Sequence, residues 1–202
     1  MEYWPEEFRA GSMLTVSSDS DQAERVIREL DELRDRTRTS GRSVATGYPL
    51  IGWGFAWAAG YSSLELLDGW WRVAAAVVAW MVGMSLSWAP MRAAVRTGTE
   101  GRMQAGWFVL MGASPFIVAA AQPATWVNIA LLLGALWSVG MVFYAIATQD
   151  VPYAVSAGIG VVAAAVASFQ EAVGPLLLFG LAAGLPLLAV GFARVIATVR
   201  RG

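Results

Sequence analysis

The sequence contains no cysteine, no histidine and no lysine, and each absence removes a class of chemistry. Without cysteine and histidine, disulfides, thiol nucleophiles, zinc sites built on these ligands and histidine general bases are excluded. All 14 basic residues are arginine, so a Schiff-base lysine for retinal or pyridoxal phosphate is excluded as well. We therefore expect neither a cofactor nor a metal centre.

Charge is also scarce. Only 14% of the 202 residues are charged and 57% are hydrophobic, whereas a soluble domain carries roughly 25% charged residues. This deficit indicates a surface that faces lipid. The net charge of -1 offers no basic field for nucleic acid. Because the signatures of serine hydrolases, phosphate-binding loops and zinc peptidases are missing too, we expect no enzymatic activity.

Long stretches without a charged side chain predict an all-α, polytopic membrane protein. A hydrocarbon core of about 30 Å requires around 20 apolar residues in helical form. The uncharged stretches cover residues 43–64, 73–91, 103–149, 151–170 and 172–193, and the longest is broken at Gln122-Pro123. Six transmembrane helices are expected within a bundle at 47–197, near residues 48–67, 70–89, 104–121, 124–147, 152–169 and 174–196.

The placement of arginine predicts the orientation of these spans. If the N-terminus is cytoplasmic, every arginine except Arg72 lies on the cytoplasmic side. Trp70, Trp71 and Trp126 then lie at outer boundaries, where aromatic anchors are enriched. An even number of spans places both termini in the cytoplasm.

The segment before the spans predicts a short amphipathic helix at residues 21–40, after a disordered stretch at 1–20. Asp21 is a helix-capping residue with Glu24 three positions later, and Gly41 can end the helix. Apolar side chains recur at spacings of three and four, at Ala23, Val26, Ile27, Leu30 and Leu33. Three roles remain open: packing on the protein's own cytoplasmic face, a coiled coil between protomers, or docking of a cytoplasmic partner.

This segment, DQAERVIRELDELRDRTR at 21–38, is followed by an apolar block rich in alanine and tryptophan. The layout resembles that of uncharacterised small multi-pass membrane proteins of GC-rich actinobacteria, and the absence of lysine fits that codon bias. The resemblance implies a location in the bacterial inner membrane and no particular activity.

Two groups of residues are candidates for ligand binding. Asn128, Trp137 and Tyr144 share the fourth expected span, where they either line a cavity or pack in the core. Glu65, Asp68 and Glu171 fall at the outer face, where they form either a site for a cation or polar ligand or a solvated rim. Buried indoles at Trp53, Trp57 and Trp80 each require a polar acceptor nearby.

The favoured function is that of a non-enzymatic accessory or regulatory membrane protein, acting through helix packing and the 21–40 helix. The alternative is a permease, either a small-solute carrier or the membrane subunit of an ATP-driven exporter. No carboxylate is expected at mid-membrane, which disfavours proton-coupled transport. Pro115 and Pro186 are interpreted as packing kinks or as gate hinges, and the GxxxG at 180–184 permits close helix approach.

Overall fold

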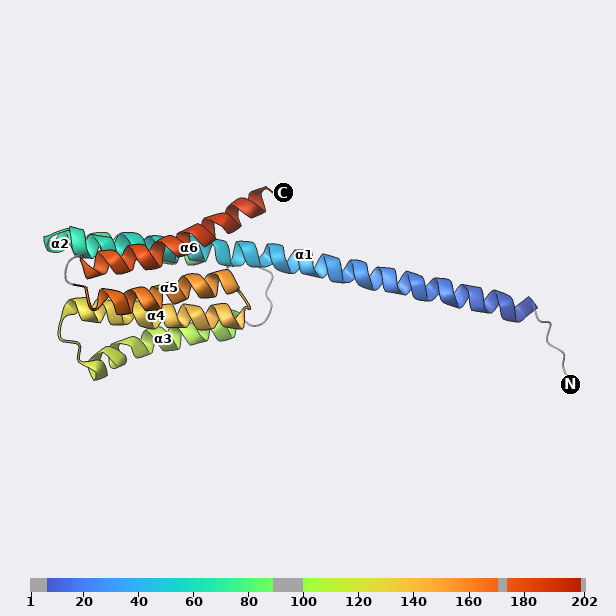
Figure 1. Cartoon of the computed structure of the whole chain (residues 1–202), viewed down its shortest axis with the longest axis horizontal. Helices are drawn as coiled ribbons and strands as arrows, with labels where there is room; N and C mark the ends of the chain where they lie inside the picture. Colours follow the sequence, from blue (N-terminus) through green and yellow to red (C-terminus); the bar gives the residue numbers. More distant parts are fainter. Residues whose placement is uncertain (1–6, 89–99, 171–173, 201–202) are drawn as a thin grey trace. The chain divides into compact units, whose positions relative to one another are not determined.

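The computed structural model describes the backbone at residues 7–88, 100–170 and 174–200, and side chains at 22–30, 46–88, 105–170, 174–197 and 199–200. Over these residues the regular structure is α-helical, which confirms the predicted all-α class. The helices are α1 (Glu7–Leu66), α2 (Gly69–Trp88), α3 (Glu100–Ala121), α4 (Trp126–Ala147), α5 (Val151–Ala167) and α6 (Pro175–Val199) (Figure 1).

The ends of the last four helices lie close to the positions predicted from local sequence. Helix α3 stops at Ala121, directly before the Gln122-Pro123 break, and Gln122 takes a left-handed φ of 45°. Thr125 caps α4 by accepting a hydrogen bond from the backbone N–H of Asn128 at 3.2 Å. Such caps satisfy amide groups that the first turn leaves unpaired.

Helix α1 differs from the prediction because it is continuous over 60 residues. The sequence predicts disorder at 1–20, a helix at 21–40 and a separate span from residue 48. One glycine inside a helix costs only about 1 kcal/mol, and each residue added to an existing helix gains a hydrogen bond. Gly41 is therefore not sufficient to end α1. The chain nevertheless divides into two compact units at this point, residues 1–41 and 42–202.

Three of the described helices are long and apolar enough to cross a membrane, by length and composition. They cover Gly69–Ser87, Trp126–Ala147 and Pro175–Ala197. Two shorter apolar helices cover Ala105–Ala121 and Val151–Ala167. The sequence predicts six spans, and the first of these falls in the C-terminal part of α1, which also carries the charged 21–40 segment.

The core of the 42–202 unit lies where α1, α4, α5 and α6 pack together. Helix α4 packs along α3 on one side and α5 on the other, and α5 packs along α6 (Figure 1). Trp57, Met141 and Phe179 are fully buried, and the rings of Trp57 and Phe179 lie 5.6 Å apart. Helix α5 contributes small side chains to this core, among them Ala157, Ala164 and Ala167.

Glycine brings the backbone of α1 into close contact with α6. A Cβ atom on Gly184 would lie 2.6 Å from both Gly54 O and Ala58 N, and one on Gly180 would lie 2.9 Å from Trp57 O. Close approach at the 180–184 GxxxG is therefore confirmed, with α1 as the partner helix. Only residues without a side chain fit these positions.

Large apolar side chains cover the outside of the same unit. Met81 on α2 is 65% exposed, and Phe108 and Phe116 on α3 are 75% and 77% exposed. On α5, Val151, Val155 and Val162 are exposed, whereas Ala157, Ala163 and Ala164 face the core. Large apolar side chains thus cover the outside of this unit as well as filling its core, which is unusual for a water-soluble protein.

Candidate functional site

The three candidate residues on α4 occupy different environments. Asn128 is exposed in the first turn, Trp137 is buried, and Tyr144 is half-buried near the C-terminal end. At 1.5 Å of rise per residue, Asn128 and Tyr144 lie about 14 Å and about 10 Å from Trp137 along the helix axis. The structure therefore does not bring the three residues to one point.

Trp137 belongs to a cluster of tryptophans from four helices. Its ring lies 4.6 Å from that of Trp80, which meets Trp53 edge-on at 5.5 Å, and Trp53 stacks on Trp107 at 6.1 Å. The Trp137 Nε1–H donates to Ser114 Oγ at 3.2 Å, and the Ser114 hydroxyl donates to Leu110 O at 2.7 Å. The cluster connects α1 to α4 through aromatic contacts and one buried hydrogen bond.

The acceptor predicted for a buried indole is missing at Trp57. Its Nε1 atom is buried and has no hydrogen-bond partner among the described residues, so the prediction is wrong at this position. Close packing is the physical reason. The Trp57 ring packs against Phe179 and against α5 at Gly160. The Ser138 hydroxyl also lies close to Gly160. That hydroxyl donates to Gly134 O at 2.7 Å instead.

A pocket of about 330 Å³ lies between α3 and α4, beside this tryptophan cluster. Its lining is apolar except for one hydroxyl, and consists of Met111, Ser114, Pro115, Val118, Ile129, Leu133 and Trp137. Among the three α4 candidates, Trp137 lines this pocket. Pro115 also contributes, so the proline inside α3 shapes the wall of the groove.

The candidate residues at the other end of the bundle form separate contacts. Glu65 Oε2 accepts a hydrogen bond from Leu176 N at 3.1 Å, which places a carboxylate at the N-terminus of α6, where it is favourable. Asp68 instead pairs with Arg72 at 3.4 Å in an exposed i,i+4 contact, and the Arg72 guanidinium lies 5.8 Å from the Trp126 ring. Glu171 lies outside the described residues.

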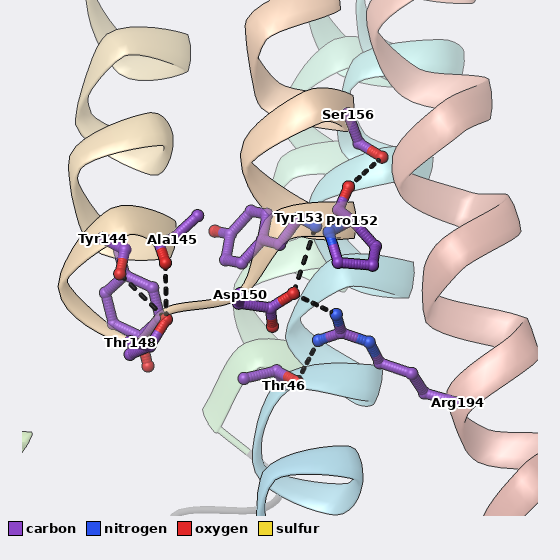
Figure 2. Close-up of polar contacts among 9 residues, drawn as sticks. All are labelled: Thr46, Tyr144, Ala145, Thr148, Asp150, Pro152, Tyr153, Ser156 and Arg194. Carbon is purple, nitrogen blue, oxygen red and sulfur yellow. Dashed lines mark hydrogen bonds and ion pairs between the residues drawn. The ribbon is translucent and has the colours of Figure 1, made fainter.

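The most buried charges meet at the opposite end, in a contact that the sequence did not predict. Arg194 on α6 forms an ion pair with Asp150 in the α4–α5 turn, with Nη2 2.5 Å from Oδ1 (Figure 2). Its Nη1 atom donates to the hydroxyl of Thr46 on α1. The side chains of Arg194 and Asp150 are 16% and 7% exposed. We refer to Thr46, Asp150 and Arg194 as the inner triad, because the topology predicted from the sequence puts this end of the bundle on the cytoplasmic side.

The local fold explains why Asp150 is available for this contact. Helix α4 ends at Ala147, Gln149 takes a left-handed φ of 54°, and the chain reverses directly into α5. Asp150 Oδ1 also accepts the backbone N–H of Tyr153 at 3.2 Å, so the carboxylate caps α5 while it pairs with Arg194. One side chain thus stabilises a helix start and holds a second helix.

The inner triad joins three segments that are remote in sequence. Thr46 lies just after the division between the two units, and Arg194 lies near the end of α6. In the topology predicted from the sequence, Asp150 falls in a turn on the cytoplasmic side and Arg194 at the cytoplasmic end of the last span, where a long arginine side chain can reach the interface. The signal in the sequence that could have predicted this ion pair is that the two opposite charges fall on the same predicted side of the membrane. Pairing them requires the packing of α6 against α5.

The arrangement is a paired and hydrogen-bonded set of charges, suited to holding helices together. Comparison of the chain with protein-family models, with curated proteins and with solved structures finds no match.

Proposed function

We propose that the chain is a six-span protein of a bacterial inner membrane, with both termini in the cytoplasm. The large apolar side chains on the outside of the bundle support this proposal, because Phe108, Phe116 and Met81 are exposed where water would disfavour them. The inner triad fits the same scheme. A buried charge in a bilayer protein is tolerable when it is paired near the interface.

Three of the six spans are the helices that are long and apolar enough to cross a membrane. The other three are supplied by α3, α5 and the C-terminal part of α1. Helix α5 and the apolar part of α3 fall within 10–17 residues, at the short end of the range that crosses a bilayer. The part of α1 from Thr46 to Leu66 supplies the first span, and it contacts α6 closely at Gly54 and Ala58.

Within this membrane setting, the protein acts as a non-enzymatic accessory or regulatory protein. It docks a partner through the cytoplasmic helix at residues 21–40. The observation that carries this proposal is the apolar stripe on that helix, where Val26, Ile27 and Leu30 are 48%, 58% and 59% exposed. A solvated helix with no partner gains nothing from three adjacent large apolar side chains.

The permease alternative is less well supported by the packing of the bundle. The space between α1, α4, α5 and α6 is filled by Trp57, Met141 and Phe179, each fully buried. The pocket between α3 and α4 is lined by apolar side chains, with Ser114 as the polar exception. A carrier for polar solutes needs polar groups that converge on a path through the membrane.

The test compares the full chain with a variant that lacks residues 1–40, each purified from native membranes in mild detergent. We expect the variant to keep the unfolding midpoint of the bundle and to lose its associated protein. The Arg28→Ser variant, altered on the charged face of the same helix, is the control and should keep the associated protein. If deletion changes no association, the accessory function is refuted. Recovery of an ATPase with both forms would favour the exporter alternative.

A further inference from the structure

The stripe on the cytoplasmic helix has the spacing of a coiled-coil seam. Ala23, Val26, Leu30 and Leu33 follow the alternation of three and four that defines heptad positions a, d, a and d. Every charged residue between 21 and 36 falls outside these positions. Ile27 falls at position e, beside the seam, and widens the apolar strip.

The described contacts agree with this register. Glu24 and Arg28 occupy positions b and f, on the outer side of such a helix, and form an i,i+4 ion pair at 3.3 Å. Their side chains are 72% and 71% exposed. The charged face is thus paired within the helix itself, whereas the side chains of Val26, Ile27 and Leu30 are about half exposed.

Charges beside the seam identify the partner. In a parallel coiled coil, position g of one helix lies beside position e of the next heptad on the other helix. Here these positions hold Glu29 and Arg34, which carry opposite charges. Two copies of the same sequence in parallel register therefore place Glu29 of each beside Arg34 of the other, twice by symmetry.

From this pattern we propose that the occupant of the stripe is a second copy of this chain, paired in parallel through residues 23–33. The proposal rests on the membrane location given above. Two copies inserted in one membrane in the same orientation present their cytoplasmic helices in the same direction. Two heptads are marginal for a free coiled coil in water, but attachment to a membrane raises the effective concentration of the second helix.

Because the chain has no cysteine, disulfide cross-linking tests the pairing directly in the full-length protein. The variants Val26→Cys and Leu30→Cys place one thiol at d and at a, and Arg28→Cys places one at f as the matched control. In a parallel pair, thiols at a and d lie near enough for a disulfide after small adjustments, whereas thiols at f point away. After oxidation of native membranes we expect cross-linked dimers at 26 and 30 and little at 28.

A charge exchange tests the register independently. With the Val26→Cys reporter, Glu29→Arg or Arg34→Glu should each lower the dimer yield by about threefold, since two exposed pairs become repulsive. The double variant Glu29→Arg/Arg34→Glu should restore it. Restoration excludes simple unfolding as the cause of the loss.

Equal cross-linking at 26, 28 and 30, or none at 26 and 30, would overturn pairing between copies. The proposed docking function is refuted by a different result, namely that deletion of residues 1–40 changes no association. If that deletion removes another cytoplasmic protein while 26 and 30 stay uncross-linked, the docking function stands and the second-copy inference is wrong.

Discussion

Breaking the inner triad by removing its arginine should strongly destabilise the bundle. Arg194→Met keeps most of the side-chain length on α6 but leaves the Asp150 carboxylate, which is 7% exposed, without its cationic partner. Loss of one member of a buried ion pair costs about 3–5 kcal/mol. Since Arg194 itself is 16% exposed, we expect the lower end, about 3 kcal/mol.

Replacing the acidic partner, in Asp150→Asn, should cost less stability than Arg194→Met because asparagine preserves the helix cap. In Asp150→Asn, the side-chain oxygen can still accept the Tyr153 N–H, as asparagine caps helices about as well as aspartate. What is lost is the charge-assisted bond to Arg194, worth about 2 kcal/mol. In the double variant no charge is left unpaired. The loss in the double variant should therefore fall short of the sum of the two single losses by about 2 kcal/mol.

The free energies can be measured by titrating the protein in dodecylmaltoside micelles with SDS and following the fluorescence of its ten tryptophans. Arg28→Met is the control, because the Glu24–Arg28 pair is exposed at both ends and should contribute little. Additive single effects, or an Arg194→Met effect as small as that of Arg28→Met, would refute the view that the inner triad holds the helices together.

Two further predictions use the same titration. Gly184→Ala should lower the free energy of unfolding by about 2 kcal/mol because its Cβ would meet the α1 backbone at 2.6 Å. Its control is Gly112→Ala, which should be neutral or slightly stabilising because nothing lies within 4 Å of the added Cβ. Equal effects of the two substitutions would contradict the close approach of α1 and α6. Ser114→Ala should cost about 1–2 kcal/mol because it leaves the buried Trp137 Nε1–H without its acceptor. Ser87→Ala is its control, since the Ser87 hydroxyl bonds only back to its own helix in the described contacts, and a similar loss there would argue against a role for the indole bond.

The helix ends that sequence predicted well are those with a local cause. Proline at 123 and the cap at Thr125 separate α3 from α4, and both act within a few residues. The continuity of α1 was missed because Gly41 is a weak signal. Its cost of about 1 kcal/mol is small beside the cooperative gain of two helical segments joined end to end.

The site residues were harder to predict because their contacts link distant segments. Its charge makes Glu65 a candidate in the sequence, yet its partner is a backbone amide of α6, which no side-chain pattern reveals. Asp150 and Arg194 are 44 positions apart, and their pairing depends on how α6 packs beside the α4–α5 turn. Among the α4 candidates, Trp137 has its contacts on α2 and α3, far from Asn128 and Tyr144.

The inner triad also has a consequence for biosynthesis. A ribosome makes α4, the turn and α5 well before it makes Arg194, which lies 44 residues after Asp150. During that interval the Asp150 carboxylate can cap α5 but lacks its cationic partner, so it remains hydrated. When α6 arrives, Arg194 allows the carboxylate to be buried and also binds the hydroxyl of Thr46 on α1. Assembly of the inner end is thereby tied to the last helix synthesised.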